Sequence, residues 1–190
     1  MNNEITDKLK AHTLLNHQIL EKSIIEMIKR IQSEKDYIRL MQIFYSYFGG
    51  LESLIKAYIN SEKLPDNLKR RKVGLVYNDI LSLGGVVPKI LSKENLPLIN
   101  NHFHAFGALY VLEGSTLGGS HIENILKIKY SIPESSLTFF RGYGQETVSM
   151  WNIFKVSLNE LTMNENEVLQ IISAADETFA RFNQWINKNT

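Results

Sequence analysis

The sequence predicts an all-α fold in a single domain. Apolar residues recur at three- and four-residue spacing along almost the whole chain, and no segment shows sustained apolar–polar alternation flanked by hairpin turns. The length of 190 residues suits one domain with a substantial core. The chain contains no internal repeat, linker or low-complexity tract. We therefore expect residues 1–190 to form one helical bundle.

Two helical segments are predicted at the N-terminus, over residues 6–20 and 23–31. The first has one face built from residues at i, i+4, i+8 and i+11, namely Leu9, Thr13, His17 and Leu20. Ser33 then resembles an N-cap, and Asp36 three residues later completes an approximate capping box. The helix that they begin is predicted to be long, over residues 34–60.

Glycines and an aspartate mark the boundaries in the next part of the chain. Gly49 and Gly50 lie inside the long helix and indicate a bend or a close contact. Asp66 is expected to cap a helix over residues 67–83, which a glycine pair ends. That helix opens with four basic residues in succession, 69–72. They most simply form a solvated face, although such a run could also dock an acidic partner.

Three further helical segments are predicted in the C-terminal half. The first covers residues 98–129 and contains several glycines. A short apolar piece between two turn-forming stretches separates it from a helix over residues 146–161. Asn164 and Glu167 form a capping pair for the last helix, residues 165–188, whose apolar stripe is typical of a core-facing side.

Composition excludes several classes of protein and site. The net charge of +1 gives no general attraction to nucleic acid or membrane. The chain has no cysteine, which excludes disulfides, thiolate nucleophiles, iron–sulfur clusters and thiolate-ligated haem. The N-terminus lacks the apolar core of a signal peptide, and the longest apolar run, 105–112, is too short to cross a bilayer. We expect a cytoplasmic protein.

The glycines of the central segment are unusual for a helix. Gly114, Gly118 and Gly119 each cost roughly 0.5–1 kcal/mol relative to alanine in a helix interior. Gly114 and Gly118 are four apart and share a face, where the bare backbone would let a flat rigid ligand or another helix approach closely. Alternatively, the helix simply ends at Gly118 and Gly119.

Metal chemistry in this chain has to use its five histidines and nearby acids. His12 and His17 point about 140° apart on a helix, which makes them poor co-ligands. No Glu-x-x-His motif occurs, so a di-iron carboxylate site is disfavoured. His17 shares the apolar face of its helix and has Glu21 one turn downstream, within reach of a ring N–H. By itself, His17 is either a metal ligand or a half-buried structural histidine.

These two signals together resemble the haem oxygenase family. The N-terminal motif is Leu9, Lys10, Thr13, His17, Leu20 and Glu21, and the downstream motif is LYVLEGSTLGG at 109–119. The chain looks most like the bacterial branch that is often associated with bacteriophytochromes. Shorter matches to this branch cover 47–52, 79–84, 142–144, Trp151, Phe154, Thr178, Phe179 and Trp185.

The resemblance implies a role for each matching residue. His17 would be the proximal iron ligand with Glu21 behind it, and residues 114–119 would lie over the distal face of the haem. The residues that this assigns to catalysis are Gly114, Ser115, Gly118 and Gly119. The residues assigned to the propionates and the pocket are Lys10, Thr13, Tyr110 and, from helix position only, Arg181. Animal relatives have an aspartate where this chain has Ser115, so hydroxyls of Ser115 and Thr116 would have to organise distal water.

The implied reaction is the cleavage of haem by O2 and reducing equivalents to biliverdin, ferrous iron and CO. Haem would be both substrate and cofactor. Electrons would come from an external reductase or ferredoxin, because the sequence has no flavin or nicotinamide fingerprint. One alternative is a haem carrier or sensor without turnover. Another is a thiaminase-like hydrolase or di-iron oxidase, which the lack of cysteine and of Glu-x-x-His disfavours.

Overall fold

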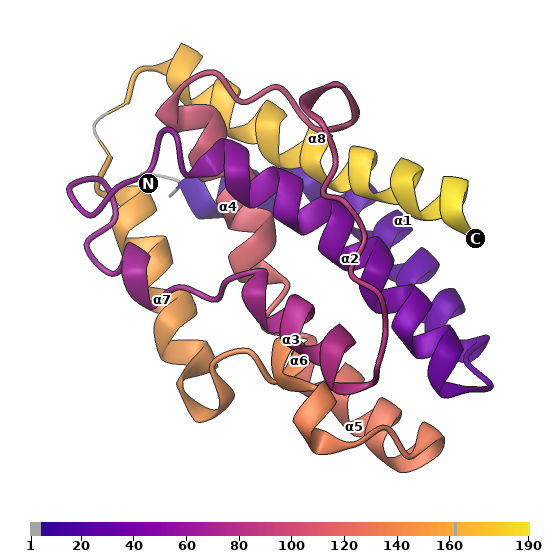
Figure 1. The fold of residues 1–190 in the computed structure, drawn as a ribbon. Helices are drawn as coiled ribbons and strands as arrows, with labels where there is room; N and C mark the ends of the chain where they lie inside the picture. Colours follow the sequence, from indigo (N-terminus) through magenta and orange to yellow (C-terminus); the bar gives the residue numbers. More distant parts are fainter. Residues whose placement is uncertain (1–4, 162) are drawn as a thin grey trace.

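The computed structural model describes residues 5–161 and 163–190, and within them the regular structure is entirely helical (Figure 1). This confirms the predicted all-α fold. The α-helices are α1 (Ile5–Lys29), α2 (Glu34–Ile55), α3 (Gly74–Ser82), α4 (His102–Gly114), α5 (Gly119–Tyr130), α6 (Thr138–Arg141), α7 (Thr147–Asn159) and α8 (Glu165–Asn189). None of the helices in these residues is both long and apolar enough to cross a bilayer.

Among the described residues, the most extensive contacts between helices are those of α8. Both α1 and α4 pack along it, whereas direct contact between α1 and α4 is sparse in the described residues. The His17 and Phe179 rings lie 5.2 Å apart, and Ser23 donates a 2.7 Å hydrogen bond to Asn183, so α1 and α8 run in the same direction. The N-terminal part of the chain and its last helix thus form one wall of the molecule (Figure 1).

Aromatic side chains from α2, α6 and α8 form the centre of the hydrophobic core. Tyr47 stacks on Phe182 with ring centroids 4.5 Å apart, and its hydroxyl donates to the Thr178 carbonyl at 2.7 Å. Phe44 meets the edge of Phe182 at 5.1 Å and that of Phe139 at 6.1 Å. Offset and edge-to-face pairs of this kind stabilise beyond their buried area.

The N-terminal helix is longer than predicted. Residues 6–20 and 23–31 were expected as two segments, but α1 is one continuous helix from Ile5 to Lys29. Residues 21–23 contain no glycine or proline to break it. Ser23 fits inside the helix because its hydroxyl reaches back to the Ile19 carbonyl at 3.2 Å, besides its bond to Asn183.

Helix α2 confirms both of its local predictions. Ser33 accepts a hydrogen bond from the Asp36 amide at 3.3 Å, and the Asp36 carboxylate accepts from the Ser33 amide at 2.9 Å, which completes the capping box. A Cβ added at Gly50 would lie 2.6 Å from the Leu91 carbonyl oxygen. The glycine pair therefore marks a close contact, where the segment between α3 and α4 crosses α2. The helix ends at Ile55, five residues before the predicted end.

The helix predicted over residues 67–83 is wrong in its first half. Only a short 3-10 turn, Asn67–Lys69, follows Asp66, and α3 begins at Gly74. Asp66 makes no side-chain cap to this turn. Its carboxylate instead binds Arg70 through two hydrogen bonds of 2.9 and 2.6 Å, and the chain leaves helical geometry to bury the Arg70 side chain.

Residues 98–129 were predicted as one helical segment, but the structure has two helices there. Helix α4 ends at Gly114, and α5 begins at Gly119. We call residues 114–119 the glycine turn. The last two helices agree with prediction within one or two residues at each end, and the Asn164–Glu167 capping box is present.

Candidate functional site

One residue interrupts the buried face of α1. Leu9, Thr13 and Leu20 are 0%, 2% and 5% exposed, as expected for a core-facing stripe. His17 lies on the same stripe between Thr13 and Leu20, yet its side chain is exposed. Leu14, three residues before His17 and next to it on the helix surface, is 47% exposed. The exposed side chains of His17 and Leu14 beside this buried stripe could contact another molecule.

The surroundings of His17 come mainly from α8 and from its own helix. The imidazole packs against the buried Phe179 ring at a tilt of 39°. Lys10 and Glu21, both predicted site residues, are exposed on α1 one or two turns from His17. Thr13 is different, because it is buried and its hydroxyl donates to the Leu9 carbonyl at 2.8 Å. Its hydroxyl proton is therefore already used within α1.

The three glycines of the glycine turn differ in the space beside them: two could accept a side chain and one could not. A Cβ added at Gly118 would meet nothing within 4 Å, and at Gly114 it would meet only the Trp151 ring, at 3.8 Å. A Cβ at Gly119 would lie 2.1 Å from the Phe140 carbonyl oxygen, a clash with backbone. Gly119 is thus required by packing against α6. At Gly114 and Gly118, by contrast, a side chain could be added without a clash.

An aromatic pair lies beside the open glycines. Tyr110 is one turn before Gly114 on α4, and its ring lies 5.4 Å from Trp151 of α7. Trp151 in turn stacks on the buried Phe154 at 5.7 Å, which fixes its position. Burial raises the pKa of the Tyr110 phenol, so it is a hydrogen-bond donor at neutral pH.

The two hydroxyls of the glycine turn bond to the end of α4. The Ser115 hydroxyl donates to the Leu112 carbonyl at 2.7 Å, and the Thr116 hydroxyl donates to the Glu113 carbonyl at 2.6 Å. These bonds satisfy two of the carbonyls that a helix leaves without partners at its C-terminus. Both hydroxyl protons are used within the chain, so these hydroxyls could bind water only as acceptors, and their role in organising distal water stays a prediction.

Arg181 lies on a different side of α8 from Phe179. Two residues along a helix correspond to about 200°, so the two side chains point in nearly opposite directions. Arg181 donates a 3.2 Å hydrogen bond to Glu177, whose carboxylate also accepts from the Leu98 amide. The role predicted for Arg181 from helix position stays a prediction, and its geometry gives it no support.

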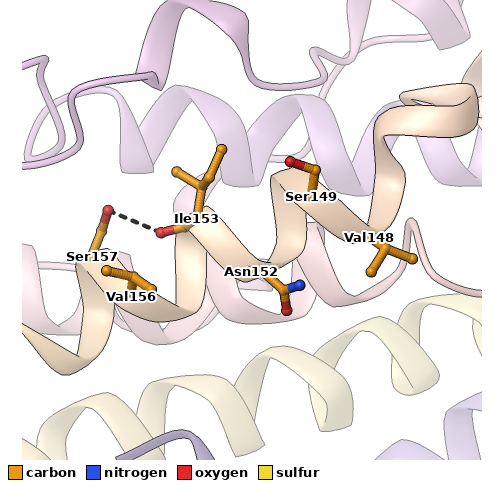
Figure 2. A pocket seen from close by; sticks show the side chains of 6 residues that line it. All are labelled: Val148, Ser149, Asn152, Ile153, Val156 and Ser157. Carbon is orange, nitrogen blue, oxygen red and sulfur yellow. Dashed lines mark hydrogen bonds between the residues drawn. The ribbon is translucent and has the colours of Figure 1, made fainter.

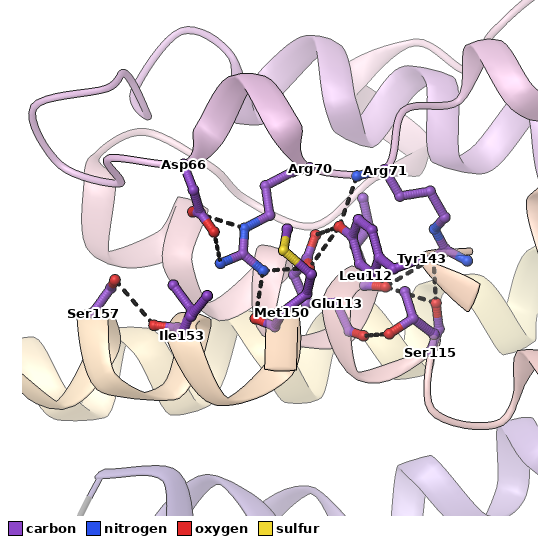
Figure 3. Close-up of polar contacts among 11 residues, drawn as sticks. Asp66, Arg70, Arg71, Leu112, Glu113, Ser115, Tyr143, Met150, Ile153 and Ser157 are labelled. Carbon is purple, nitrogen blue, oxygen red and sulfur yellow. Dashed lines mark hydrogen bonds and ion pairs between the residues drawn. The ribbon is translucent and has the colours of Figure 1, made fainter. Parts of the chain in front are cut away.

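A buried polar cluster lies next to the glycine turn and includes Glu113, the residue before Gly114 (Figure 3). Arg70 donates at 2.8 Å both to the Glu113 carboxylate and to the Met150 carbonyl. Tyr143 donates to the same carboxylate at 2.9 Å, and burial, together with the nearby Glu113 charge, raises the pKa of its phenol. Arg70 and Glu113 are only 3% and 2% exposed. With Asp66, they form a charge-paired group of the kind that a low-dielectric interior tolerates.

The cluster corrects the expectation of a solvated face over residues 69–72. Lys69 and Lys72 are exposed, but Arg70 is buried and Arg71 is half-buried. The signal that could have found this was Glu113, a carboxylate within an otherwise apolar stretch of sequence. A carboxylate in such a position needs a cationic or hydrogen-bonding partner. Sequence reasoning missed Arg70, Arg71, Glu113 and Tyr143 as neighbours of the glycine turn.

We expect the Arg70→Met variant to be strongly destabilised. It would leave the Glu113 charge buried without its cation, which costs about 3–5 kcal/mol. For a chain of this size the melting temperature should fall by roughly 6–20 °C. Lys69→Met is the matched control, because Lys69 is adjacent and exposed. Thermal unfolding followed by circular dichroism measures both; equal melting temperatures would contradict the importance of the pair.

The most evident surface groove lies elsewhere, along the outer face of α7 (Figure 2). Its volume is about 520 Å³. Its lining consists of small apolar and polar side chains, which are Val148, Ser149, Asn152, Ile153, Val156 and Ser157. None of these is a titratable residue or a residue predicted for the site. The groove offers no acid, base or histidine ligand and is not the candidate site.

Within residues 5–161 and 163–190, no group of three or more histidine, cysteine, aspartate or glutamate side chains could enclose a metal ion. The His17 imidazole is exposed beside Phe179, and the open space beside Gly114 and Gly118 is a separate feature at the end of α4. An exposed imidazole can offer one ring nitrogen to a metal whose other ligands come with it, as in a porphyrin.

The chain is similar to known proteins both in sequence and in fold. A sequence model described as Heme oxygenase matches residues 94–188, half of the chain. The fold matches a heme oxygenase from Neisseria meningitidis, solved with bound NO and CO, with a TM-score of 0.86 at 20% identity over 98% of this chain and 92% of the other.

A heme oxygenase from Leptospira interrogans matches with a TM-score of 0.75 at 15% identity, over 97% of this chain and 99% of the other. No curated protein matches the sequence. The two structural likenesses establish the fold, and association with bacteriophytochromes stays a prediction. Through the match to the family model, together with this fold, the chain belongs to the haem oxygenase family.

Proposed function

We propose that this protein is a haem oxygenase that cleaves haem, with O2 and external electrons, to biliverdin, ferrous iron and CO. The observation that carries the proposal is the exposed imidazole of His17 within an otherwise buried stripe of α1, in a chain of this family. Bound haem would supply both the substrate and the iron at which O2 is reduced.

His17 would provide the axial nitrogen to the iron. When one ring nitrogen of a neutral imidazole binds a metal, the other nitrogen carries the N–H, and the acceptor of that N–H fixes the tautomer and the ring angle. Glu21, one turn along α1 and exposed, is the acceptor that we propose. Phe179 packs against the ring and would limit its rotation.

The glycine turn would cover the opposite face of the haem. Gly114 and Gly118 would place backbone, without acid or base side chains, over the iron, and the space next to them is open. Such an arrangement would keep acidic and basic side chains away from bound O2, and it would limit the directions in which O2 could lie. Shape, rather than an acidic group, would then select the meso carbon that is oxidised.

The charged edge of the substrate needs polar partners at the rim of the site. Lys10 lies two turns before His17 on α1, and we propose that its ammonium binds a propionate. The Tyr110 hydroxyl, beside Trp151, is the second proposed partner. Thr13 would contribute packing only, because its hydroxyl is bonded within α1.

The remaining features follow from the family resemblance and are also proposals. The electron donor would be a separate reductase or ferredoxin. Biliverdin could supply the chromophore of a bacteriophytochrome in the same cytoplasm. A haem carrier or sensor with the same pocket is the second candidate, because haem binding alone would need the same His17 environment.

Hemin titration followed by turnover tests the proposal and separates the two candidates. We expect equimolar binding with a Soret band typical of histidine-ligated haem. With ascorbate or ferredoxin under air, this band should give way to the spectrum of biliverdin. Tight binding with haem that stays intact would favour the carrier, and failure to bind hemin would contradict both.

A further inference from the structure

Arg71 connects three separate segments at the glycine turn. One terminal nitrogen, Nη2, donates to the Leu112 carbonyl at 2.9 Å and to the Ser115 hydroxyl at 2.6 Å. The other, Nη1, donates to the Phe139 carbonyl at 3.3 Å. The guanidinium also lies over the Phe139 ring, 4.1 Å from its centroid. Arg71 therefore joins the end of α4 to α6 from the segment before α3.

The backbone of Arg71 is held by the buried cluster. Its amide donates to the Tyr143 hydroxyl at 2.7 Å, and that hydroxyl donates to Glu113. Glu113 is itself bound by Arg70. The side chain of Arg71 thus starts from a fixed point, which lowers the entropy that it loses in making its own three bonds.

The two ends of the glycine turn are fixed to adjacent residues of α6. At one end, Arg71 links Ser115 to the Phe139 carbonyl. At the other end, Gly119 approaches the Phe140 carbonyl so closely that no side chain would fit. Between these two points, a Cβ added at Gly118 would meet nothing within 4 Å. The position of the turn therefore depends on its ends.

Ser115 serves this connection. Its hydroxyl donates to Leu112 and accepts from Arg71, so the proton that it could offer to another group is already used. Burial lowers the pKa of the Arg71 guanidinium to about 10, and it still carries its charge at neutral pH. A charged donor to a hydroxyl and two carbonyls forms stronger bonds than a neutral one.

We infer that Arg71 is a positioning residue, which sets where the glycine turn lies relative to α6 by joining Ser115 and Leu112 to Phe139. An effect of Arg71 on the reaction rests on the proposed function, whereas the Arg71 bonds to Ser115, Leu112 and Phe139 form in the haem-free chain. Lysine cannot replace it, because an ammonium is a single compact donor group without the planar fork.

Hydrogen exchange of the haem-free protein tests the connection. We compare wild type with Arg71→Met, Arg71→Lys and the control Lys72→Met, which removes an adjacent exposed charge. The reporting amides are those of Thr116, Leu117 and Gly119, which donate within the turn. Arg71→Met should speed their exchange roughly tenfold or more while exchange in α8 is unchanged. Arg71→Lys should be intermediate, and Lys72→Met should match wild type.

The bilin product gives a second readout, which a merely structural role would not change. If Arg71 positions the turn, Arg71→Met should spread cleavage over more than one meso carbon, whereas Lys72→Met keeps the wild-type isomer. Unchanged exchange at the turn, a uniform loss of protection that includes α8, or an unchanged isomer pattern in Arg71→Met would each overturn the inference. A wild-type protein that makes no bilin would refute the proposed function, while the exchange result would still decide whether Arg71 holds the turn.

Discussion

The His17→Ala variant is expected to lose haem turnover while still binding some hemin. The loss should exceed the roughly 10–100-fold that removal of a group supporting a metal ligand typically causes. Binding should persist in weaker form, because the apolar and aromatic surface from Leu14 and Phe179 remains. Anaerobic hemin titration and bilin formation under reducing conditions measure the two properties separately.

His12→Ala is the matched control for this variant. His12 is exposed on the same helix but points about 140° from His17, so its loss should change neither the Soret band nor the rate. Free imidazole should partly restore the spectrum of the His17→Ala complex by occupying the space of the missing ring. If His17→Ala keeps the wild-type spectrum and rate, the proposed ligand is wrong.

Leucine at Gly114 or Gly118 should abolish turnover without unfolding the protein. A Cβ fits at both positions, because the nearest neighbour is the Trp151 ring at 3.8 Å from Gly114 and nothing lies within 4 Å of Gly118. Neither glycine needs a positive φ, so its replacement should also favour folding by roughly 0.4–1 kcal/mol, because the unfolded chain becomes less flexible. The side chain would, however, fill the space proposed for the haem. Hemin affinity, turnover and melting temperature are the measurements.

Gly119→Ala is the informative contrast, since it lies in the same motif. Its added methyl group would meet the Phe140 carbonyl oxygen at 2.1 Å, so we expect a destabilisation of about 1–3 kcal/mol from overpacking. The pocket variants should therefore lose function and keep stability, and Gly119→Ala should lose stability. Normal turnover by the Gly114→Leu variant would show that the glycine turn is not over the haem.

Local signals in the sequence predicted much of the fold. The capping residues Ser33 and Asn164 act through contacts within a few residues, and both predictions are confirmed. The close contact indicated by the glycine pair at Gly50 is also confirmed, although its partner Leu91 could not be predicted. Gly114, Gly118 and Gly119 also indicated an irregular part of the central segment, and the helix is interrupted there. Sequence did not show which glycine serves packing, because this depends on how close α6 lies to Gly119.

The largest error in the predicted helices comes from a long-range polar contact. The helix predicted after Asp66 fails because Arg70 turns inward to Glu113, 43 residues away in sequence. Periodicity cannot detect such a pair, since both residues look like surface charges in isolation. The bond from Arg71 to Ser115 is also long-range, 44 residues apart in sequence. The motifs predict His17 and the glycine turn as site residues, whereas the contacts of the turn with Arg71 and α6 are visible only in three dimensions.

The central claim is that haem binds between the His17 imidazole and the backbone of Gly114 and Gly118. A crystal structure of the hemin complex tests it most directly. The account predicts that the iron is bonded to a ring nitrogen of His17 and that the opposite face of the porphyrin lies against the glycine turn. Iron bonded to another residue, or a porphyrin whose second face lies away from residues 114–119, would contradict it.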